Sequence, residues 1–253
     1  MGKIISVSNQ KGGVGKTTTS LSLAASLGVL EKKVLLIDAD PQGNATSGIG
    51  ITTKDFDKSS YDVLLNQCKI QDSIISTKSP NLDIIPANID LVAVEIEIVD
   101  VKKRELMLSK MTNNIKDKYD FIIIDCPPSL GLITINALTA SDSVIIPIQC
   151  EYYALEGLGK LLNTIKGVQK VHNEKLEIEG ILLTMFDSRL RLSNQVKKDV
   201  EKHFGNMVFS TIIPRNVSLG EAPSHGESII VYNSTSKGSK SYIKFAQEVI
   251  NLN

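Results

Sequence analysis

A glycine-rich run near the start of the chain limits what the chain can fold into more than any other feature of the sequence. It follows an apolar stretch that predicts a strand, Ile4–Ser8, and precedes an apolar-periodic stretch that predicts a helix, Thr17–Leu30. A strand, a glycine turn and a helix N-terminus together direct successive backbone N–H groups at one point, which suits a di- or triphosphate. The residues expected to bind this nucleotide are Lys11, Gly12, Gly13, Val14, Gly15, Lys16, Thr17 and Thr18.

The side chains within this loop predict its chemistry. Lys16 is expected to reach the oxygens of the β- and γ-phosphates, and the Thr17 hydroxyl is expected to hold Mg²⁺. A side chain at Gly12 or Gly15 would occupy the space that the phosphates need. A Rossmann dinucleotide site is excluded, because Thr18 stands where that pattern needs its third glycine. The sequence thus favours ATP with Mg²⁺ as the ligand.

Two predicted strands, Val34–Asp38 and Phe121–Asp125, end in carboxylates. Asp40, just past the first strand, is placed to orient the water that attacks the γ-phosphate, whereas Asp38 is expected to contact the magnesium hydration shell or the loop. Asp125 follows four apolar residues, the Walker B form, and is expected to accept hydrogen bonds from Mg²⁺-bound water. Each aspartate, taken alone, is also an ordinary residue of a strand end or turn.

Short apolar runs alternate with helical patterns along the whole chain, which predicts βαβ units. The expected strands are Ile4–Ser8, Val34–Asp38, Leu82–Pro86, Phe121–Asp125, Ser143–Ile148, Ile178–Thr184 and Val208–Ile213. The expected helices are Thr17–Leu30, Ser60–Gln67, Arg104–Ile115, Gly131–Ala140, Leu155–His172, Asn194–Phe204 and Lys237–Leu252. The fold class is therefore α/β, one domain over residues 1–253 with a mostly parallel sheet flanked by helices on both faces. Ligands are expected beyond the carboxyl ends of the strands.

Composition excludes several other classes of protein. No apolar run approaches the roughly 18 residues that cross a membrane, and the first apolar stretch is too short for a signal peptide. Three cysteines without CxxC spacing indicate reduced thiols in a cytoplasm. The formal net charge is zero, so any nucleic acid must be bound through a local basic patch.

The phosphate loop departs from the ordinary pattern GxxxxGK[ST], and the departure carries a family resemblance. Gln10 replaces the first glycine and Lys11 follows it, giving the deviant Walker A loop KGGVGKTT. With this loop and the segment Asp38-Ala39-Asp40-Pro41-Gln42-Gly43-Asn44, the chain resembles the ParA/MinD class of P-loop ATPases. The resemblance implies a P-loop NTPase fold and a sandwich homodimer in which Lys11 reaches the partner's ATP. The alternative is that Lys11 is a solvated surface lysine.

Two later segments resemble the chromosomal ParA (Soj) branch of that class: 147–158, with the sequence PIQCEYYALEGL, and 213–226, which begins IPRNV. This resemblance implies that Glu151 lies near the nucleotide and dimer face, and that Met185, Pro214 and Asn216 line an adenine pocket. It also implies that the ATP-bound dimer binds DNA without sequence preference on the nucleoid. Slow hydrolysis, stimulated by a ParB-type partner protein, would then release it.

The candidate DNA-binding patch lies within residues 189–203. Its basic residues are Arg189, Arg191, Lys197, Lys198 and Lys202. The charge pattern alone equally allows a solvated helix face, and the resemblance favours DNA, with Arg189 as the first candidate. Relatives commonly carry a second basic residue where this chain has Ser218 and Gly220, so Lys237 and Lys240 are candidate replacements.

Two alternative functions remain to be weighed against the DNA-partitioning ATPase that the resemblance implies. A MinD-like membrane ATPase needs a basic amphipathic C-terminal helix, but residues 242–253 contain one lysine and one glutamate. No membrane binding is therefore expected. A P-loop phosphotransferase or ligase needs an additional pocket for an acceptor beside the γ-phosphate. The sequence contains no acceptor motif, and that reading leaves Lys11 without a role.

Overall fold

The centre of the fold is a seven-stranded sheet with the strand order β3-β4-β2-β5-β1-β6-β7. The computed structural model describes residues 2–152 and 157–253. Every neighbouring pair of strands is parallel except β3 and β4. The strands are β1 Lys3–Val7, β2 Val34–Asp38, β3 Ile75–Ser76, β4 Leu82–Ile85, β5 Phe121–Asp125, β6 Ser143–Gln149 and β7 Glu177–Thr184. The predicted α/β class with a mostly parallel sheet is confirmed.

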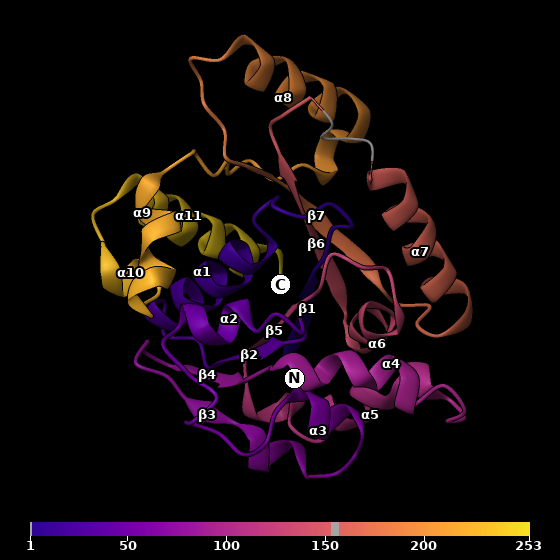
Figure 1. Ribbon diagram of the computed structural model, residues 1–253. Helices are drawn as coiled ribbons and strands as arrows, with labels where there is room; N and C mark the ends of the chain where they lie inside the picture. The colour runs from indigo at the N-terminus through magenta and orange to yellow at the C-terminus, as the bar shows by residue number, and fades with distance from the viewer. Residues whose placement is uncertain (1, 153–156) are drawn as a thin grey trace.

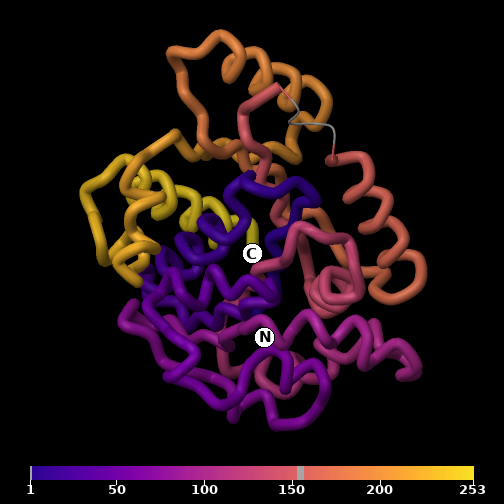
Figure 2. The backbone as a smooth tube through the Cα atoms, viewed as in Figure 1, coloured from indigo at the N-terminus to yellow at the C-terminus, as the bar shows by residue number. Residues whose placement is uncertain are grey.

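Helices cover both faces of this sheet (Figures 1 and 2). The longer helices are α1 Lys16–Val29, α6 Leu132–Ala140, α7 Leu158–Val171, α8 Arg191–Phe204 and α11 Lys237–Leu252. Shorter ones are α2 Asn44–Gly48, α3 Ser60–Leu64, α4 Val94–Glu97, α5 Met107–Thr112, α9 Val217–Glu221 and α10 Ile229–Tyr232. The 3₁₀ turns are η1 Ile70–Ser73, η2 Ile89–Ala93, η3 Arg104–Leu106, η4 Lys116–Lys118, η5 Gly205–Met207 and η6 Ala222–His225. Within the described residues, no helix is both long and apolar enough to cross a membrane.

The central strands are continuous apolar runs because both of their faces are covered. Along β2, Leu36 points into the core formed with α1 and α11, while its neighbours Leu35 and Ile37 point into the core formed with α3 to α6. The alternation along a strand thus fills two cores at once. All five residues of β2 and of β5 are buried, including the aspartate that ends each strand.

The prediction of a strand at Val208–Ile213 is wrong. This segment runs beside β7 and makes only an isolated bridge between Val208 and Ile181, with N–H bonds from Phe209 and Ile213 to carbonyls of β7. The backbone N–H groups between them bond instead to the Glu248 carboxylate on α11, from Ser210 at 2.7 Å and from Thr211 at 2.9 Å. Because a side chain takes these two donors, no continuous ladder forms.

Several other boundaries also differ from those predicted. The expected helix Arg104–Ile115 divides into η3 and α5, the expected helix Ser60–Gln67 ends at Leu64, and α8 begins three residues earlier than expected. The first residue of the expected helix Leu155–His172 lies outside the described residues, and α7 is described from Leu158. The two-residue edge strand β3 and the short helices α2, α4, α9 and α10 carry too few residues for a periodic signal.

The irregular segment beside β7 is held by Phe209, which gives a test of its contribution to stability. Phe209 is buried, and its ring meets that of Phe245 edge-on at 4.8 Å. It also lies over Gly180, where a Cβ atom would come within 2.6 Å of the ring. We expect Phe209→Ala to lower the free energy of unfolding by about 3–5 kcal/mol, measured by urea denaturation. The exposed neighbour Met207 serves as control: Met207→Ala should change it by less than about 0.5 kcal/mol. Equal losses in both variants would contradict this account.

Candidate nucleotide-binding site

The phosphate loop is anchored to strands β6 and β7. The Asn9 amide donates to the carbonyl of Pro147 at 2.7 Å, and its oxygen accepts the N–H of Lys11 at 3.0 Å. The Thr184 hydroxyl, at the end of β7, donates to the carbonyl of Val14 at 2.8 Å. The loop is therefore held in shape by neighbouring strands, which prepares its amide groups to bind an anion.

The turn depends on Gly13 and Gly15, and Gly12 borders open space. Gly13 and Gly15 have φ of 73° and 88°, the left-handed region that side chains rarely adopt. A Cβ atom at Gly12 or Gly13 would meet no other atom within 4 Å. The loop thus borders a cradle that a side chain at Gly12 would partly fill.

This cradle is a cavity of about 390 Å³. It is lined by Gly12, Gly13, Gly15, Lys16, Thr17, Thr18, Asp40, Gln42, Asn44, Pro128 and Met185. Six of the loop residues predicted from the sequence therefore share one cavity with the predicted catalytic Asp40. The sequence reasoning did not single out Gln42, Asn44 or Pro128, although all three lie in polar segments that follow predicted strands.

The Lys16 ammonium group is hydrogen-bonded within its own loop. Its Nζ donates to the carbonyl of Lys11 at 3.1 Å, and the residue is only 7 % exposed. Burial lowers the pKa of Lys16, while the nearby carboxyl of Asp125 opposes that change. A lysine that has already lost much of its hydration can contact an anionic ligand at low desolvation cost.

Asp38 and Asp125 are register partners on β2 and β5, and both are fully buried. Asp38 accepts hydrogen bonds from the N–H and hydroxyl of Thr46, at 2.8 and 2.7 Å, and from the N–H of Asp40 at 3.1 Å. Asp125 accepts one from the Ser20 hydroxyl at 2.8 Å, and its other oxygen has no partner among the described residues. Asp38 is thus occupied by the segment after β2, whereas Asp125 keeps an oxygen available.

The electrostatics of this pair favour a cation. Burial raises the pKa of Asp125, and the neighbouring Asp38 raises it further; burial likewise raises the pKa of Asp38. A buried carboxylate is costly unless it is paired or coordinates a metal. Thr17 lines the cavity beside them, so the donor set, one hydroxyl and carboxylate oxygens, fits the hard oxygen ligands that Mg²⁺ takes.

A second cavity of about 220 Å³ adjoins the loop and contains the residues expected to bind adenine. Met185, Pro214 and Asn216 all line it, together with Thr184, Arg215, Leu219, Gly220 and Tyr242, which the sequence reasoning missed. The backbone of Met185 is left-handed, with φ of 51°. The buried Asn216 Oδ1 has no partner among the described residues. The lining of this cavity is largely apolar and includes the Asn216 amide group, which suits a planar base.

Lys11 and Val14, which were also expected to bind the nucleotide, are not in the described lining of either cavity, and neither is Glu151. Glu151 is half exposed, and its Oε1 accepts from Gln149 at 2.7 Å and from Arg215 at 3.2 Å. Arg215 lines the second cavity, so Glu151 lies one side chain away from it.

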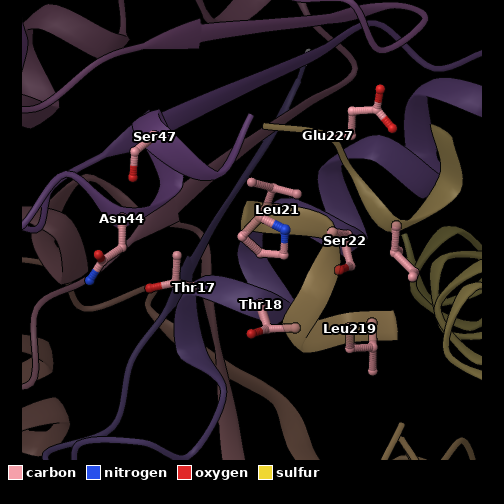
Figure 3. A pocket seen from close by; sticks show the side chains of 11 residues that line it. Thr17, Thr18, Leu21, Ser22, Asn44, Ser47, Leu219 and Glu227 are labelled. Carbon is pink, nitrogen blue, oxygen red and sulfur yellow. The ribbon is translucent and has the colours of Figure 1, made fainter. Parts of the chain in front are cut away.

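A third cavity, of about 290 Å³, lies beside the first turns of α1, between α2 and the segment from α9 to α10 (Figure 3). It shares Thr17, Thr18 and Asn44 with the phosphate cavity. Of the described residues, neither Lys16 nor Asp40 lines it. An acceptor for phosphoryl transfer must approach the γ-phosphate in line, beside those two residues, so this cavity lacks the groups that an acceptor site needs.

The predicted basic patch lies on α8 and the turn before it, at the top of Figure 1. Arg189 is exposed but already bonded to Asp187, from Nε at 2.9 Å and from a terminal nitrogen at 2.7 Å. This pairing holds the pKa of Asp187 at about 2. Lys197 lies 3.7 Å from Glu201, whereas Arg191, Lys198 and Lys202 are exposed and form no ion pair with other described residues.

The fold and this site define a P-loop ATPase whose phosphate loop carries two lysines. A family model described as an AAA domain matches residues 2–178. The sporulation initiation inhibitor protein Soj of Bacillus subtilis (strain 168) is 57 % identical over 249 residues, 98 % of each chain. The chromosome partitioning protein ParA of Myxococcus xanthus (strain DK1622) is 51 % identical over 250 residues, 99 % of this chain and 88 % of that one. The chain belongs to this ParA/Soj family of partitioning ATPases.

A solved structure is similar as well. The crystal structure described as cobyrinic acid a,c-diamide synthase from Mycobacterium smegmatis, with bound ATP analog and magnesium, has a TM-score of 0.88 and 36 % identity. The likeness covers 99 % of this chain and 95 % of that one. It extends the shared fold over all the segments that line the three cavities.

The buried carboxylates predict how stability changes with pH in the absence of metal. Because burial raises their pKa, the folded chain keeps protons that the unfolded chain releases, so stability falls as pH rises from about 4 through neutrality. We expect Asp125→Asn to be at least about 1 kcal/mol more stable than wild type at pH 8 in EDTA, and to lose this advantage toward pH 5. Urea denaturation at both pH values measures it. The exposed Asp117→Asn variant is the control, and a wild-type stability that does not fall with pH would contradict the prediction.

Proposed function

We propose that this chain is a cytoplasmic, nucleoid-associated partitioning ATPase in which bound ATP closes a sandwich dimer. The dimer binds DNA without sequence preference, and slow hydrolysis, stimulated by a ParB-type partner, releases it. One observation carries the proposal: Lys16 alone turns into its own loop, bonding the Lys11 carbonyl, and no described acidic side chain forms an ion pair with Lys11. Lys11, which precedes Gly12 of the cradle, is thus proposed to meet a nucleotide held by another copy.

The proposed ligand is ATP with Mg²⁺. Lys16 and the loop amides hold the phosphates, and Thr17, Asp38 and Asp125 are the residues that hold the metal or its hydration shell. The metal, when bound, neutralises charge on the phosphates. Met185, Pro214 and Asn216 take the base, and Glu151 positions Arg215 beside that pocket. The ATP analog and magnesium of the mycobacterial structure support this assignment.

Asp40 is the residue proposed to orient the attacking water. It lines the phosphate cavity, and its Oδ1 accepts the N–H of Gln42 at 3.0 Å, which fixes the carboxylate in the turn after β2. Little covalent chemistry is asked of the protein in phosphoryl transfer, so positioning of this kind is its main contribution. A single orienting carboxylate is consistent with weak intrinsic turnover.

The two alternative functions lack support at the relevant surfaces. The apolar side chains of α11, Tyr242, Phe245 and Val249, are buried in the core against α1, so they are not available to a membrane. The third cavity lacks Lys16 and Asp40 among its described lining, so it does not supply an acceptor site for a transferase or ligase. Partitioning remains the function that the loop and the relatives support.

The dimer is tested through Lys11. With a non-hydrolysable ATP analogue and Mg²⁺, we expect wild type to sediment as a dimer and Lys11→Ala to stay monomeric, because the partner's phosphates lose a cation. Lys11→Ala should keep its affinity for the nucleotide within about threefold, whereas Lys16→Ala should lose it by at least about a hundredfold. Analytical ultracentrifugation and calorimetry measure the two quantities. A wild type that stays monomeric at saturating nucleotide would overturn the proposal.

DNA binding is tested through the patch on α8. Phosphate contacts release counterions, so affinity should fall with salt by about 0.9 log units per log unit of salt for each contact. We expect Arg189→Glu and Lys198→Glu to weaken retention on a non-specific duplex and to flatten this slope, with nucleotide binding unchanged. Lys170→Glu on α7 is the control. If retention at moderate salt is undiminished in both patch variants, the DNA site lies elsewhere.

A further inference from the structure

Thr46 differs from its polar neighbours on the short helix α2. It is only 3 % exposed, whereas Asn44 and Ser47 on the same helix are exposed. Its backbone N–H and its hydroxyl both donate to Oδ2 of Asp38, at 2.8 and 2.7 Å. The hydroxyl has a single hydrogen to donate, and that hydrogen is directed at this buried carboxylate.

The oxygen of the same hydroxyl also accepts a hydrogen bond. The donor is the N–H of Ala87, just after β4, at 2.9 Å. The Ala87 carbonyl lies against the turn after β2, where a Cβ atom on Gly43 would come within 2.9 Å of it. One side chain therefore joins the ends of β2 and β4, which are neighbouring strands. Because all these groups are buried, bulk water cannot take the place of the hydroxyl, and both hydrogen bonds depend on it.

The other oxygen of Asp38 extends this connection to the phosphate cavity. Its Oδ1 accepts the N–H of Asp40 at 3.1 Å, and the Asp40 carboxylate accepts the N–H of Gln42 at 3.0 Å. Asp40 and Gln42 both line the cavity. The two oxygens of a carboxylate are fixed relative to each other, so a bond that holds Oδ2 also fixes where Oδ1 meets the backbone of Asp40.

We propose that Thr46 is a positioning residue for ATP hydrolysis: its hydroxyl fixes the Asp38 carboxylate and, through it, the turn that carries Asp40. This inference deepens the proposed function and rests on the role given there to Asp40. Among the described residues, the lining of the phosphate cavity does not include Thr46, so Thr46 acts through Asp38 and not on the reactants. Lys16 and the loop amides belong to a different segment, so the effect falls on the rate of hydrolysis and not on nucleotide binding.

The closely isosteric variant Thr46→Val removes the hydroxyl and keeps the shape of the side chain. We expect its rate of hydrolysis at saturating ATP and Mg²⁺ to fall by at least about tenfold, because Asp40 is no longer held in place. The Kd of a non-hydrolysable analogue should change by less than about threefold. Thr46→Ser keeps the hydroxyl and should hydrolyse ATP within about threefold of the wild-type rate. Phosphate release measures the rates, and calorimetry measures the Kd.

Thr112→Val is the matched control for a loss of stability. Thr112 is buried on α5, and its hydroxyl donates to the carbonyl of Leu108 at 3.0 Å. It is not among the described residues that line the phosphate cavity. Both valine variants lose a buried hydroxyl hydrogen bond, so a general loss of stability would slow hydrolysis in both. We expect Thr112→Val to stay within about twofold of wild type.

Amide hydrogen exchange tests the connection in the absence of nucleotide and metal. The N–H groups of Asp40 and Ala87 are bonded to Asp38 and Thr46, which protects them from exchange. We expect Thr46→Val to speed the exchange of both by at least about tenfold relative to the buried Ile123 amide on β5. Thr46→Ser and Thr112→Val should leave this ratio near its wild-type value. NMR measures the exchange of each amide.

A double variant shows whether Thr46 acts through Asp40. When Thr46→Val is added to Asp40→Asn, we expect no further loss of rate, because the carboxylate that Thr46 positions is already absent.

Four results would overturn the proposal: a wild-type rate in Thr46→Val, equal losses in Thr46→Val and Thr112→Val, a rate in Thr46→Ser as low as that in Thr46→Val, or a further loss in the double variant. If instead wild type hydrolyses no ATP, the proposed function fails. The exchange of the Asp40 and Ala87 amides then still decides whether the Thr46 hydroxyl fixes the turn.

Discussion

The arrangement of this site depends on two carboxylates that are buried side by side. Asp38 and Asp125 end neighbouring strands at the same register position, where water cannot reach them. Such a pair is stable only with protons or with a cation. Asp38 accepts hydrogen bonds from Thr46, whereas one oxygen of Asp125 has no hydrogen-bond partner among the described residues. The buried pair therefore favours a bound cation.

The same geometry explains how the nucleotide can be sensed. Thr46 bonds Asp38 and Ala87, Ser20 on α1 bonds Asp125, and Lys16 bonds back to Lys11. Thr46, after β2, and Ser20, on α1, therefore bond the buried pair directly, whereas Ala87 is linked to the pair through Thr46. A ligand that changes the charge on that pair would therefore act on the turn after β2 and on α1.

Two helices at the surface of the molecule are well separated. Helix α8, which carries the basic residues, lies at the top of the molecule in Figure 1, and α4 lies lower on its right side.

The sequence by itself determined the features that depend on residues close together in the chain: the phosphate loop, the acidic ends of β2 and β5, the parallel α/β pattern and the helices with strong periodicity. It could not determine contacts made across long separations. These include Ser20 on Asp125, Thr184 on the loop, and Glu248, whose carboxylate takes the N–H groups that a predicted strand at 208–213 needed. Whether an apolar residue such as Ile96 faces the core or solvent was likewise decided only by tertiary packing, since both faces of its helix are apolar and the pattern cannot tell which one the core will cover.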